Sequence, residues 1–402
     1  MQLLIMKGLV TPVSFLIGIA TVLVLIILMD SFYIPPKWEP HIKGHSASFL
    51  LDLPGFDYLI NNQICNESNK SDIRVIMIIT SHAGNVATRQ AHRTALPKDL
   101  LTVVGVRRVF LLAVASTESS SHQYSSIKQQ LIYEEDNVNG DLIQGNFNEA
   151  YRNLTYKHMM GLQWVSKYCS SVKYVIKMDD DIILDIFQLL KALPQMVNDS
   201  NQFLLGYLLK GMKPIRDPLN KWFVSMKEYP KTYYPPFLSG WMYVTTPEIV
   251  SRIVRIAQEH RSPPTVKDSY LSFFWIDDVF VTGILSGLVG AKLIDFSRYF
   301  GVHPQYFQCC VEANVIGRAH KSISDEESLL CDYVVGPSGG DMDLLMKFME
   351  DAKKCWIMGE LCIGSTNSTH STKTCVVGRG GAYDWVRRPF KSGEAILKTI
   401  KL

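Results

Sequence analysis

The sequence predicts an α/β domain with a mainly parallel sheet, preceded by an N-terminal transmembrane helix. Three short, β-branched and nearly continuous apolar runs, at residues 73–80, 109–114 and 174–178, are typical of strands that are buried on both faces. Between the second and third runs, from Tyr151 to Cys169, apolar residues recur at spacings of three or four, which indicates a helix. Buried strands that alternate with helices favour a parallel sheet covered by helices.

Length and composition set the limits of this fold. The chain has 402 residues, of which 47% are hydrophobic, enough for one large or two medium domains. Lys and Arg number 41 against 38 Asp and Glu, a balance that gives no indication of a nucleic-acid partner.

The N-terminal segment indicates a membrane anchor. Residues 8–29 contain no charged side chain, and Lys7 and Asp30 bound the run. At about 1.5 Å per residue this run is long enough to cross a bilayer, and it lacks the small-residue cleavage site of a signal peptide. We therefore expect a cytoplasmic tail at residues 1–7, an uncleaved signal-anchor at 8–29 and a lumenal stem at 30–72.

The cysteines and glycosylation signals agree with a lumenal location. Eight Cys residues occur without a CxxC motif, so disulfides are favoured over a metal cluster, although their pairing cannot be deduced. The chain also has Asn-x-Ser/Thr sequons, at Asn66, Asn69, Asn153, Asn198 and Asn367. Together with the anchor, these features predict a protein of the secretory pathway.

Three adjacent carboxylates, Asp179 to Asp181, directly follow the third predicted strand. Ligands of such sheets bind outside the carboxyl ends of the strands. Carboxylate oxygens suit Mg²⁺ or Mn²⁺, and a bound cation would also offset the repulsion among the three side chains. The alternative is a helix N-terminus that is enriched in acids, with Asp185 in its first turn.

A second acidic pair, Asp277 and Asp278, lies in an apolar and aromatic segment. A carboxylate in such surroundings can have a raised pKa and serve as a general base. The alternative is that Asp278 caps a helix that runs on through Leu285. His158 lies on the apolar stripe of the helix predicted before Cys169, where we expect a packed or hydrogen-bonded core histidine rather than a ligand.

The order of these and other short motifs resembles one known family. The sequence is similar to the β-1,3-galactosyltransferase and β-1,3-N-acetylglucosaminyltransferase group, glycosyltransferase family 31, over roughly residues 73–325. The resemblance implies a Rossmann-like GT-A domain on a single-pass type II Golgi membrane protein. The matching motifs are residues 78–81, 89–94, 109–112, 140–143, 151–157, 164–169, 177–181, 234–240 with 243–244, 277–280 and 320–324.

The resemblance also implies a donor site that holds a UDP-sugar through Mn²⁺. It assigns the metal to Asp181, Asp179 and His320, with Asp179 also facing the nucleotide-sugar. Asp180 is grouped with the donor-binding residues, while an alternative role for its side chain is to anchor the turn. The remaining donor contacts implied by the resemblance are Arg89 and Arg93 on the uridine diphosphate and a Ser239–Gly240 turn near the transferred sugar and the acceptor.

The catalytic base implied by the resemblance is Asp278, with Asp277 as the other choice. The expected reaction is an inverting, Mn²⁺-dependent transfer of a hexose, with galactose favoured, from the UDP-sugar to a sugar hydroxyl of a glycan on a glycoprotein or glycolipid. The expected product is a β-1,3 linkage. Alternatives are a non-catalytic GT-A-like lumenal module that assists another transferase and, less favoured, a metal-dependent nucleotide hydrolase. Residues 326–402 have no counterpart in the resemblance, and we expect a disulfide-bonded extension.

Overall fold

The structure is a computed structural model, and it describes residues 49–66, 73–115, 129–197, 202–260, 270–319, 328–358 and 362–363. The predicted tail and anchor, most of the predicted stem, and His320 lie outside the described residues. Within these ranges, no helix combines the length and the apolar character that crossing a bilayer requires.

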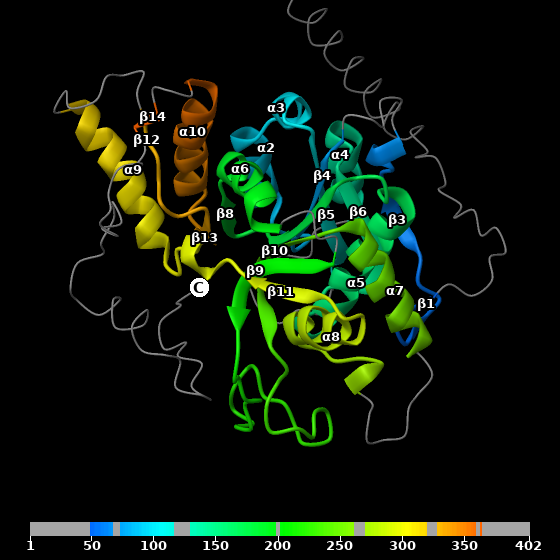
Figure 1. The fold of residues 1–402 in the computed structure, drawn as a ribbon. Helices are drawn as coiled ribbons and strands as arrows, with labels where there is room; N and C mark the ends of the chain where they lie inside the picture. The colour runs from blue at the N-terminus through cyan, green and yellow to red at the C-terminus, as the bar shows by residue number, and fades with distance from the viewer. Residues whose placement is uncertain are drawn as a thin grey trace, which may run out of the picture. The chain divides into compact units, whose positions relative to one another are not determined.

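A mixed sheet of eight strands forms the centre of the fold (Figure 1). Strands β10 and β3 run antiparallel to their neighbours and all other adjacent pairs are parallel, which confirms the predicted mainly parallel sheet. The three strands predicted from the sequence are β4, β5 and β7. In spatial order the strands are β11 (Lys292–Asp295), β9 (Phe203–Leu209), β10 (Phe237–Thr245), β7 (Tyr174–Asp179), β4 (Val75–Thr80), β5 (Val106–Val114), β6 (Leu142–Asn148) and β3 (Tyr58–Asn61).

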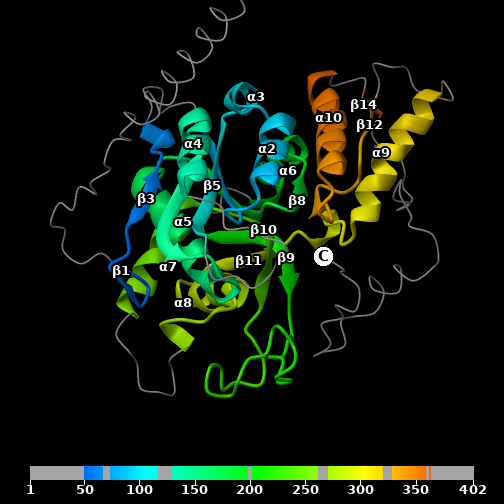
Figure 2. The ribbon, with the colours of Figure 1, turned by 180° about the vertical axis from the view of Figure 1, so that it is seen from behind.

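Helices cover both faces of this sheet because its central strands are apolar on both sides. In β4, Met77 and Ile79 face one hydrophobic cluster while Ile76 and Ile78 face another. Figures 1 and 2 show α2, α3 and α6 on one side of the sheet and α7 and α8 on the other. The first side carries α2 (Val86–Ala95), α3 (Lys98–Val103), α4 (Gln129–Asn139) and α6 (Ile186–Val197), and the second carries α5 (Leu154–Tyr168), α7 (Pro247–Glu259), the π-helix η5 (Asp278–Leu285) and α8 (Ser286–Leu288).

Strand register brings the two acidic segments to one edge of the sheet. Thr80 at the end of β4 lies opposite Asp179 at the end of the parallel strand β7. Strand β10 runs the other way, with Tyr243 opposite Lys177, so its first half extends past the carboxyl end of β7. Helix η5 packs against β10 and so carries Asp278 to the same edge.

The predicted Ser239–Gly240 turn is wrong, because both residues lie inside β10. The pairing of β10 with β9 shifts register between Leu238 and Tyr243, so the strand is irregular at this point. Ser and Gly are common in turns, but here the glycine serves a close approach by Asp278 that is described below.

The predicted stem ends earlier than residue 72, since residues 49–66 belong to the folded domain. The hairpin of β1 (Phe49–Leu50) and β2 (Leu53–Pro54) precedes β3, which pairs with β6, and the 3-10 helix η1 (Ile64–Asn66) follows. A disulfide joins Cys65 to Cys169 at the end of α5. Edge strands of two to four residues carry too little periodicity to be recognised in a sequence.

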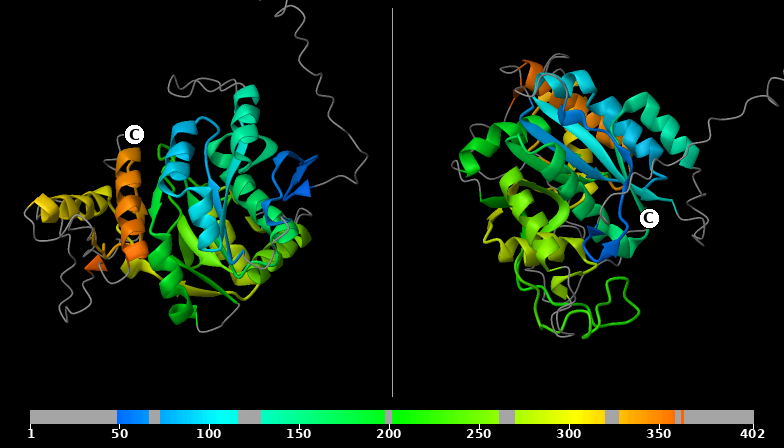
Figure 3. Two further views of the ribbon diagram at one scale, coloured as in Figure 1. Left: turned by 90° about the horizontal axis from the view of Figure 1, so that it is seen from above. Right: turned by 90° about the vertical axis from the view of Figure 1, so that its right-hand side faces the viewer.

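The domain boundary predicted at residue 325 is also wrong. Strand β13 (Val335–Pro337) pairs with β8 (Ile182–Leu184), and Val335, Leu345 and Phe348 join the first hydrophobic cluster. Figure 3 shows α9 and α10 at one end of the sheet, with α10 beside α2. This region comprises the 3-10 helix η6 (Ser297–Tyr299), α9 (Pro304–Ala319), the parallel pair β12 (Ser328–Leu329) and β14 (Cys362–Ile363), and α10 (Met342–Met358).

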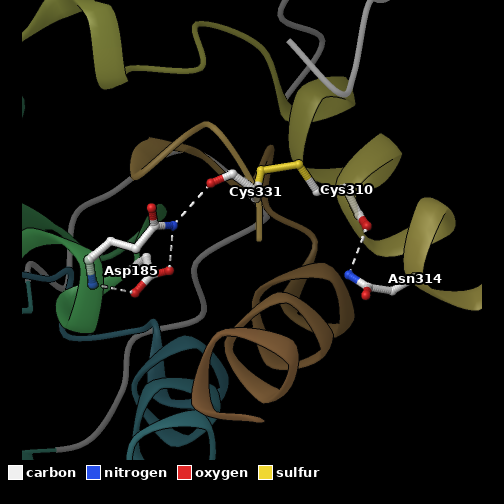
Figure 4. Close-up of a disulfide and its surroundings, with 5 residues drawn as sticks. Asp185, Cys310, Asn314 and Cys331 are labelled. Atoms are coloured by element: carbon white, nitrogen blue, oxygen red, sulfur yellow. Dashed lines mark hydrogen bonds between the residues drawn. A yellow bond between two sulfur atoms is a disulfide. The ribbon is translucent and has the colours of Figure 1, made fainter. Parts of the chain in front are cut away.

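Disulfides reinforce this C-terminal region, as the cysteine count predicts. The bond between Cys310 and Cys331 joins α9 to the segment before β13, close to Asp185 at the start of α6 (Figure 4). Cys309 and Cys355 are disulfide-bonded as well. Asp185 is the N-cap of α6, because its Oδ1 accepts hydrogen bonds from the backbone N–H groups of Phe187 and Gln188.

Candidate active site

The three adjacent carboxylates after β7 have three different surroundings. Asp179 accepts a 2.7 Å hydrogen bond from Lys177 Nζ, and its side chain is 35% exposed. The buried Asp180 accepts bonds from Ser81 Oγ at 2.6 Å and Asn85 Nδ2 at 3.0 Å, so its carboxylate anchors the turn after β4. Asp181 is exposed. The sequence alternative of an acidic helix start applies to Asp185 but not to these residues.

The guanidinium group of Arg89 is fully buried, and protein atoms use all its N–H groups. Nε and Nη2 donate to Glu135, Nη1 donates to Ser81 Oγ and His82 O, and Nη2 also donates to Ala83 O. A guanidinium has five N–H donors, so none remains for a diphosphate in this arrangement. Arg89 therefore holds the loop after β4 in place, which differs from the direct donor contact that the sequence predicts.

Arg93 has similar protein partners. Its Nε and Nη2 donate to Asp141 at 3.0 and 2.7 Å, and Nη2 lies 2.8 Å from Glu135. Nη1 is buried, and it has no hydrogen-bond partner among the residues that the structure describes. The carboxylates come from α4 and from the residue before β6, a pairing that spacing along the chain does not reveal.

Lys177 connects the two acidic segments. Its side chain is 1% exposed, and Nζ donates to Asp179 Oδ1 at 2.7 Å and to Gly240 O at 2.8 Å. Nζ also lies 4.0 Å from Asp277 Oδ2. Burial alone would lower the pKa of Lys177, but the charges of Asp179, Asp277 and Asp278 raise it, so the lysine is an ammonium ion.

Asp179 remains in an excess of negative charge despite this lysine. Burial, together with repulsion by Asp181 and Asp277, raises the pKa of Asp179 to about 7 against the attraction of Lys177. Partial desolvation by the surrounding loop and repulsion by Asp180 also raise the pKa of Asp181, although its side chain is exposed. A further cation at this edge would stabilise both ionised carboxylates.

Asp277 is held by a buried chain of hydrogen bonds. His158 Nδ1 lies 2.9 Å from Asp277 Oδ2, and His158 Nε2 lies 2.7 Å from Tyr243 Oη. Burial lowers the pKa of His158 and raises that of Tyr243. The neutral histidine thus accepts a hydrogen bond from the Tyr243 hydroxyl at Nε2 and donates its Nδ1–H to Asp277.

The neighbouring Asp278 has a different environment. Its Oδ2 accepts a 2.8 Å hydrogen bond from the backbone N–H of Gly240. A Cβ atom at position 240 would lie only 2.2 Å from Asp278 Oδ1, so only glycine permits this contact. Burial and repulsion by Asp277 raise the pKa of Asp278 well above its usual range.

Helices α5 and η5 fix this pair against β10. Thr155 Oγ1 donates to Phe274 O at 2.8 Å, one turn before His158 on the same face of α5. Thr282 Oγ1 donates to Asp278 O and accepts from Leu238 N, which joins η5 to β10. The π-helical conformation itself is common at functional sites.

The structure brings Asp179, Asp277, Asp278 and Gly240 together and places Asp181 on the same loop. The predicted cap by Asp278 is wrong, since Asp278 is the first residue of η5 itself, and the side chain of Asp277 at the N-cap position makes no capping bond. His158 is a hydrogen-bonded core histidine as expected, but its partner makes it part of the site. Sequence reasoning also missed Lys177 and Tyr243; the only signal was a lysine inside an apolar strand.

The residues present fit a hard divalent cation. Asp179 and Asp181 offer carboxylate oxygens at an accessible edge, and such cations commonly use one or two carboxylates plus substrate phosphates. In the part of the chain that the structure describes, no three His, Cys, Asp or Glu side chains converge on one point. The predicted third ligand, His320, is outside that part.

The mixed sheet, with helices on both faces and carboxylates at the carboxyl ends of its strands, is an α/β fold of the kind that binds ligands at this edge. A family model described as galactosyltransferase matches residues 87–297, about half of the chain. The chain belongs to this galactosyltransferase family, which confirms the family predicted from the sequence motifs.

Individual relatives agree with this family. Beta-1,3-galactosyltransferase 5 of Pan troglodytes is 33% identical over 209 residues, which cover 52% of this chain and 63% of the relative. The mouse protein of the same name is 33% identical over 267 residues, which cover 66% of this chain and 74% of the relative. Lactosylceramide 1,3-N-acetyl-beta-D-glucosaminyltransferase of Xenopus tropicalis is 28% identical, covering 66% and 69%. The chain thus spans less than two thirds of the chimpanzee relative's length.

Proposed function

We propose that this protein is an inverting hexosyltransferase that uses a UDP-sugar, preferably UDP-galactose, and forms a β-1,3 linkage to a glycan hydroxyl. Family membership and the names of the relatives support the reaction class. The observation that carries the mechanism is that two adjacent carboxylates have different partners, His158 for Asp277 and the backbone N–H of Gly240 for Asp278, beside the carboxylates after β7.

Asp278 is the general base in this proposal. Hydrogen bonding by His158 and attraction by Lys177 outweigh burial and lower the pKa of Asp277 to about 2, which makes Asp277 a weak base. The pKa of Asp278 is shifted the other way, so Asp278 is the stronger base of the two carboxylates. Pairs of titratable groups with pKa values pushed apart commonly divide acid–base roles in this manner.

Asp277 then has a positioning role. Its charge, held by His158 and Lys177, keeps the Asp278 carboxyl basic, while Gly240 N–H fixes the direction of one Asp278 oxygen. In this proposal an oxygen of Asp278 takes the proton from an acceptor hydroxyl.

The transfer proceeds as a single displacement. The acceptor oxygen forms a bond to the anomeric carbon as its proton passes to Asp278, and the bond from that carbon to UDP breaks with its electron pair on the departing phosphate. Asp179 and Asp181 would hold a Mn²⁺ ion, which supplies charge neutralisation for the leaving diphosphate. Lys177 keeps Asp179 oriented through its 2.7 Å contact.

Replacement of the base tests the proposal. The Asp278→Asn variant should lose transfer by roughly 10²–10⁴-fold, the contribution of a positioned general base, and should keep its affinity for UDP. Transfer is measured as acceptor-dependent UDP release, and UDP affinity by calorimetry. The matched control Asp277→Asn should retain more activity, so an Asp277→Asn variant more impaired than Asp278→Asn reverses the assignment.

A non-catalytic module that assists another transferase is the second candidate. Such a module would need neither the hydrogen bond between Gly240 N–H and Asp278 nor the negative charge of Asp277 beside it. UDP release with Mn²⁺, with and without a panel of sugar acceptors, separates the two, and a donor-by-acceptor screen with linkage analysis defines the sugar. We also propose the Golgi membrane as location, with a single-pass type II anchor, which microscopy of the full chain tests.

A further inference from the structure

Tyr151, Trp222 and Trp275 form an aromatic cluster at the carboxyl edge of the sheet. Tyr151 begins the 3-10 helix η3 (Tyr151–Asn153), three residues after β6, and its side chain is 50% exposed. Its hydroxyl accepts a hydrogen bond from Trp222 Nε1, and its ring centroid lies 6.0 Å from that of Trp275. Trp275 is buried, so it supports the two more exposed rings.

This cluster lies beside the candidate catalytic groups. Trp275 precedes Asp277 by two residues, and both belong to the segment that Thr155 tethers to α5. Burial, together with the negative charges of Asp278, Asp277 and Asp179, raises the pKa of Tyr151 against the hydrogen bond from Trp222.

The loop that carries Trp222 is held firmly in this place. Residues 210–236 connect β9 to β10 and extend from the sheet as a long loop (Figure 1). Arg152 next to Tyr151 bonds to Glu228 of this loop at 2.7 Å, and Arg216 donates to the carbonyls of Val224 and Tyr229 at 2.7 Å. Loops of this length in compact domains are usually functional, and this one is anchored beside Tyr151.

The chemistry of the cluster suits a sugar ring. The Lys221 ammonium lies over the Trp222 ring, 4.5 Å from its centroid, and over the Tyr151 ring at 6.0 Å. The Arg152 guanidinium lies over the Trp275 ring at 4.5 Å, so a cation lies against one face of each ring. A pyranose presents a face of C–H groups and a rim of hydroxyls, which matches apolar rings bordered by polar groups.

We propose that Tyr151 and Trp222 form the acceptor subsite, on which the terminal pyranose of the acceptor lies with its C–H face on the rings and a hydroxyl toward Asp278. The inference rests on the proposed transferase function, because that function requires an acceptor sugar within reach of the base. It adds the residues that bind this sugar and the face by which they recognise it.

Saturation-transfer NMR tests the subsite without relying on turnover. The probes are methyl β-galactopyranoside and methyl N-acetyl-β-glucosaminide, each with the full chain, UDP and Mn²⁺. Wild-type protein should transfer saturation mainly to the axial ring protons of at least one probe. The Tyr151→Leu and Trp222→Leu variants should lose this signal, and their KM for the acceptor should rise at least about tenfold, or about 1.4 kcal/mol of binding free energy, with the donor KM unchanged.

Two further variants control for indirect effects. Tyr233→Leu removes an equally exposed tyrosine of the same loop, which contacts Lys213 rather than Tyr151, and should leave both measurements unchanged. Tyr151→Phe keeps the ring but loses the hydroxyl that Trp222 contacts, so it should cost only a few-fold in acceptor KM.

The outcomes separate the subsite from the reaction. Transfer with an unchanged acceptor KM in Tyr151→Leu, a rise in donor KM alone, or no saturation of either probe by wild type overturns the subsite. Probe binding that the variants abolish, in a protein without transfer to any acceptor, supports the subsite and overturns the transferase proposal.

Discussion

The two acidic segments at this edge of the sheet treat their carboxylates in opposite ways. After β7, Asp179 and Asp181 are partly or fully exposed, and Lys177 is their only close cationic partner among the described contacts. At η5, Asp277 and Asp278 are each fixed by a neutral or backbone donor, His158 or Gly240. The carboxylates after β7 leave negative charge that a cationic ligand can neutralise, whereas the contacts at η5 set the protonation state of a base.

Replacement of Asp181, in the segment after β7, should cause the largest loss of transfer activity. Asp181→Asn changes an exposed side chain, so the fold should persist while transfer falls by about 10³-fold, because a metal ligand is lost. We expect the affinity for UDP in Mn²⁺ to fall in parallel, measured by calorimetry. The comparison fails if Asp181→Asn lowers turnover alone and binds UDP normally.

Gly240→Ala should disturb the position of Asp278 at the start of η5 and so lower turnover. The new Cβ would displace Asp278, and a misplacement of about 1 Å can cost about 10²-fold in rate. We expect turnover to fall while UDP affinity is unchanged, the reverse of the result for Asp181→Asn. Normal turnover would show that the contact between Asp278 and Gly240 has no bearing on the reaction.

The pH dependence of turnover should reveal the coupling between Asp277 and Asp278. Turnover requires ionised Asp278, so it rises with pH through the raised pKa of that residue. Asp277→Asn removes a negative charge that repels ionised Asp278, while the charges of Lys177 and Asp179 remain. The pKa of Asp278 should therefore fall, and the acidic limb of the kcat profile should move to lower pH. Profiles of kcat in wild type and variant check the direction, and a shift to higher pH would contradict the assigned coupling.

Loss of the Cys310–Cys331 disulfide should have the smallest effect on activity. This bond supports the region whose Ser338 N–H donates to Asp181 O at 2.8 Å. The Cys310→Ser/Cys331→Ser double variant should lose roughly 2–4 kcal/mol of unfolding free energy. We expect at most a few-fold rise in donor KM and no change in acceptor KM. A rise in acceptor KM alone would show that this region supports the Asp277–Asp278 segment instead of the segment after β7.

Local patterns were sufficient for the central strands, for α5 and for both acidic segments, because each is a contiguous run with its own periodicity. They failed where function depends on pairing between distant residues. The sequence displays Arg89 as a free positive charge, and only the fold shows that Glu135 neutralises it. Likewise His158 resembles a core residue until Asp277, over a hundred positions away, is placed beside it.

The pairing of β13 with β8 also has a consequence for biosynthesis. Asp181 O receives its hydrogen bond from Ser338, 157 positions later (338 − 181), so this turn cannot close until most of the described chain has been made. Contacts of such long range form slowly, and β8 presents an unpaired edge meanwhile. We expect nascent chains that stop before β13 to engage chaperones and to mature only after that strand has been made.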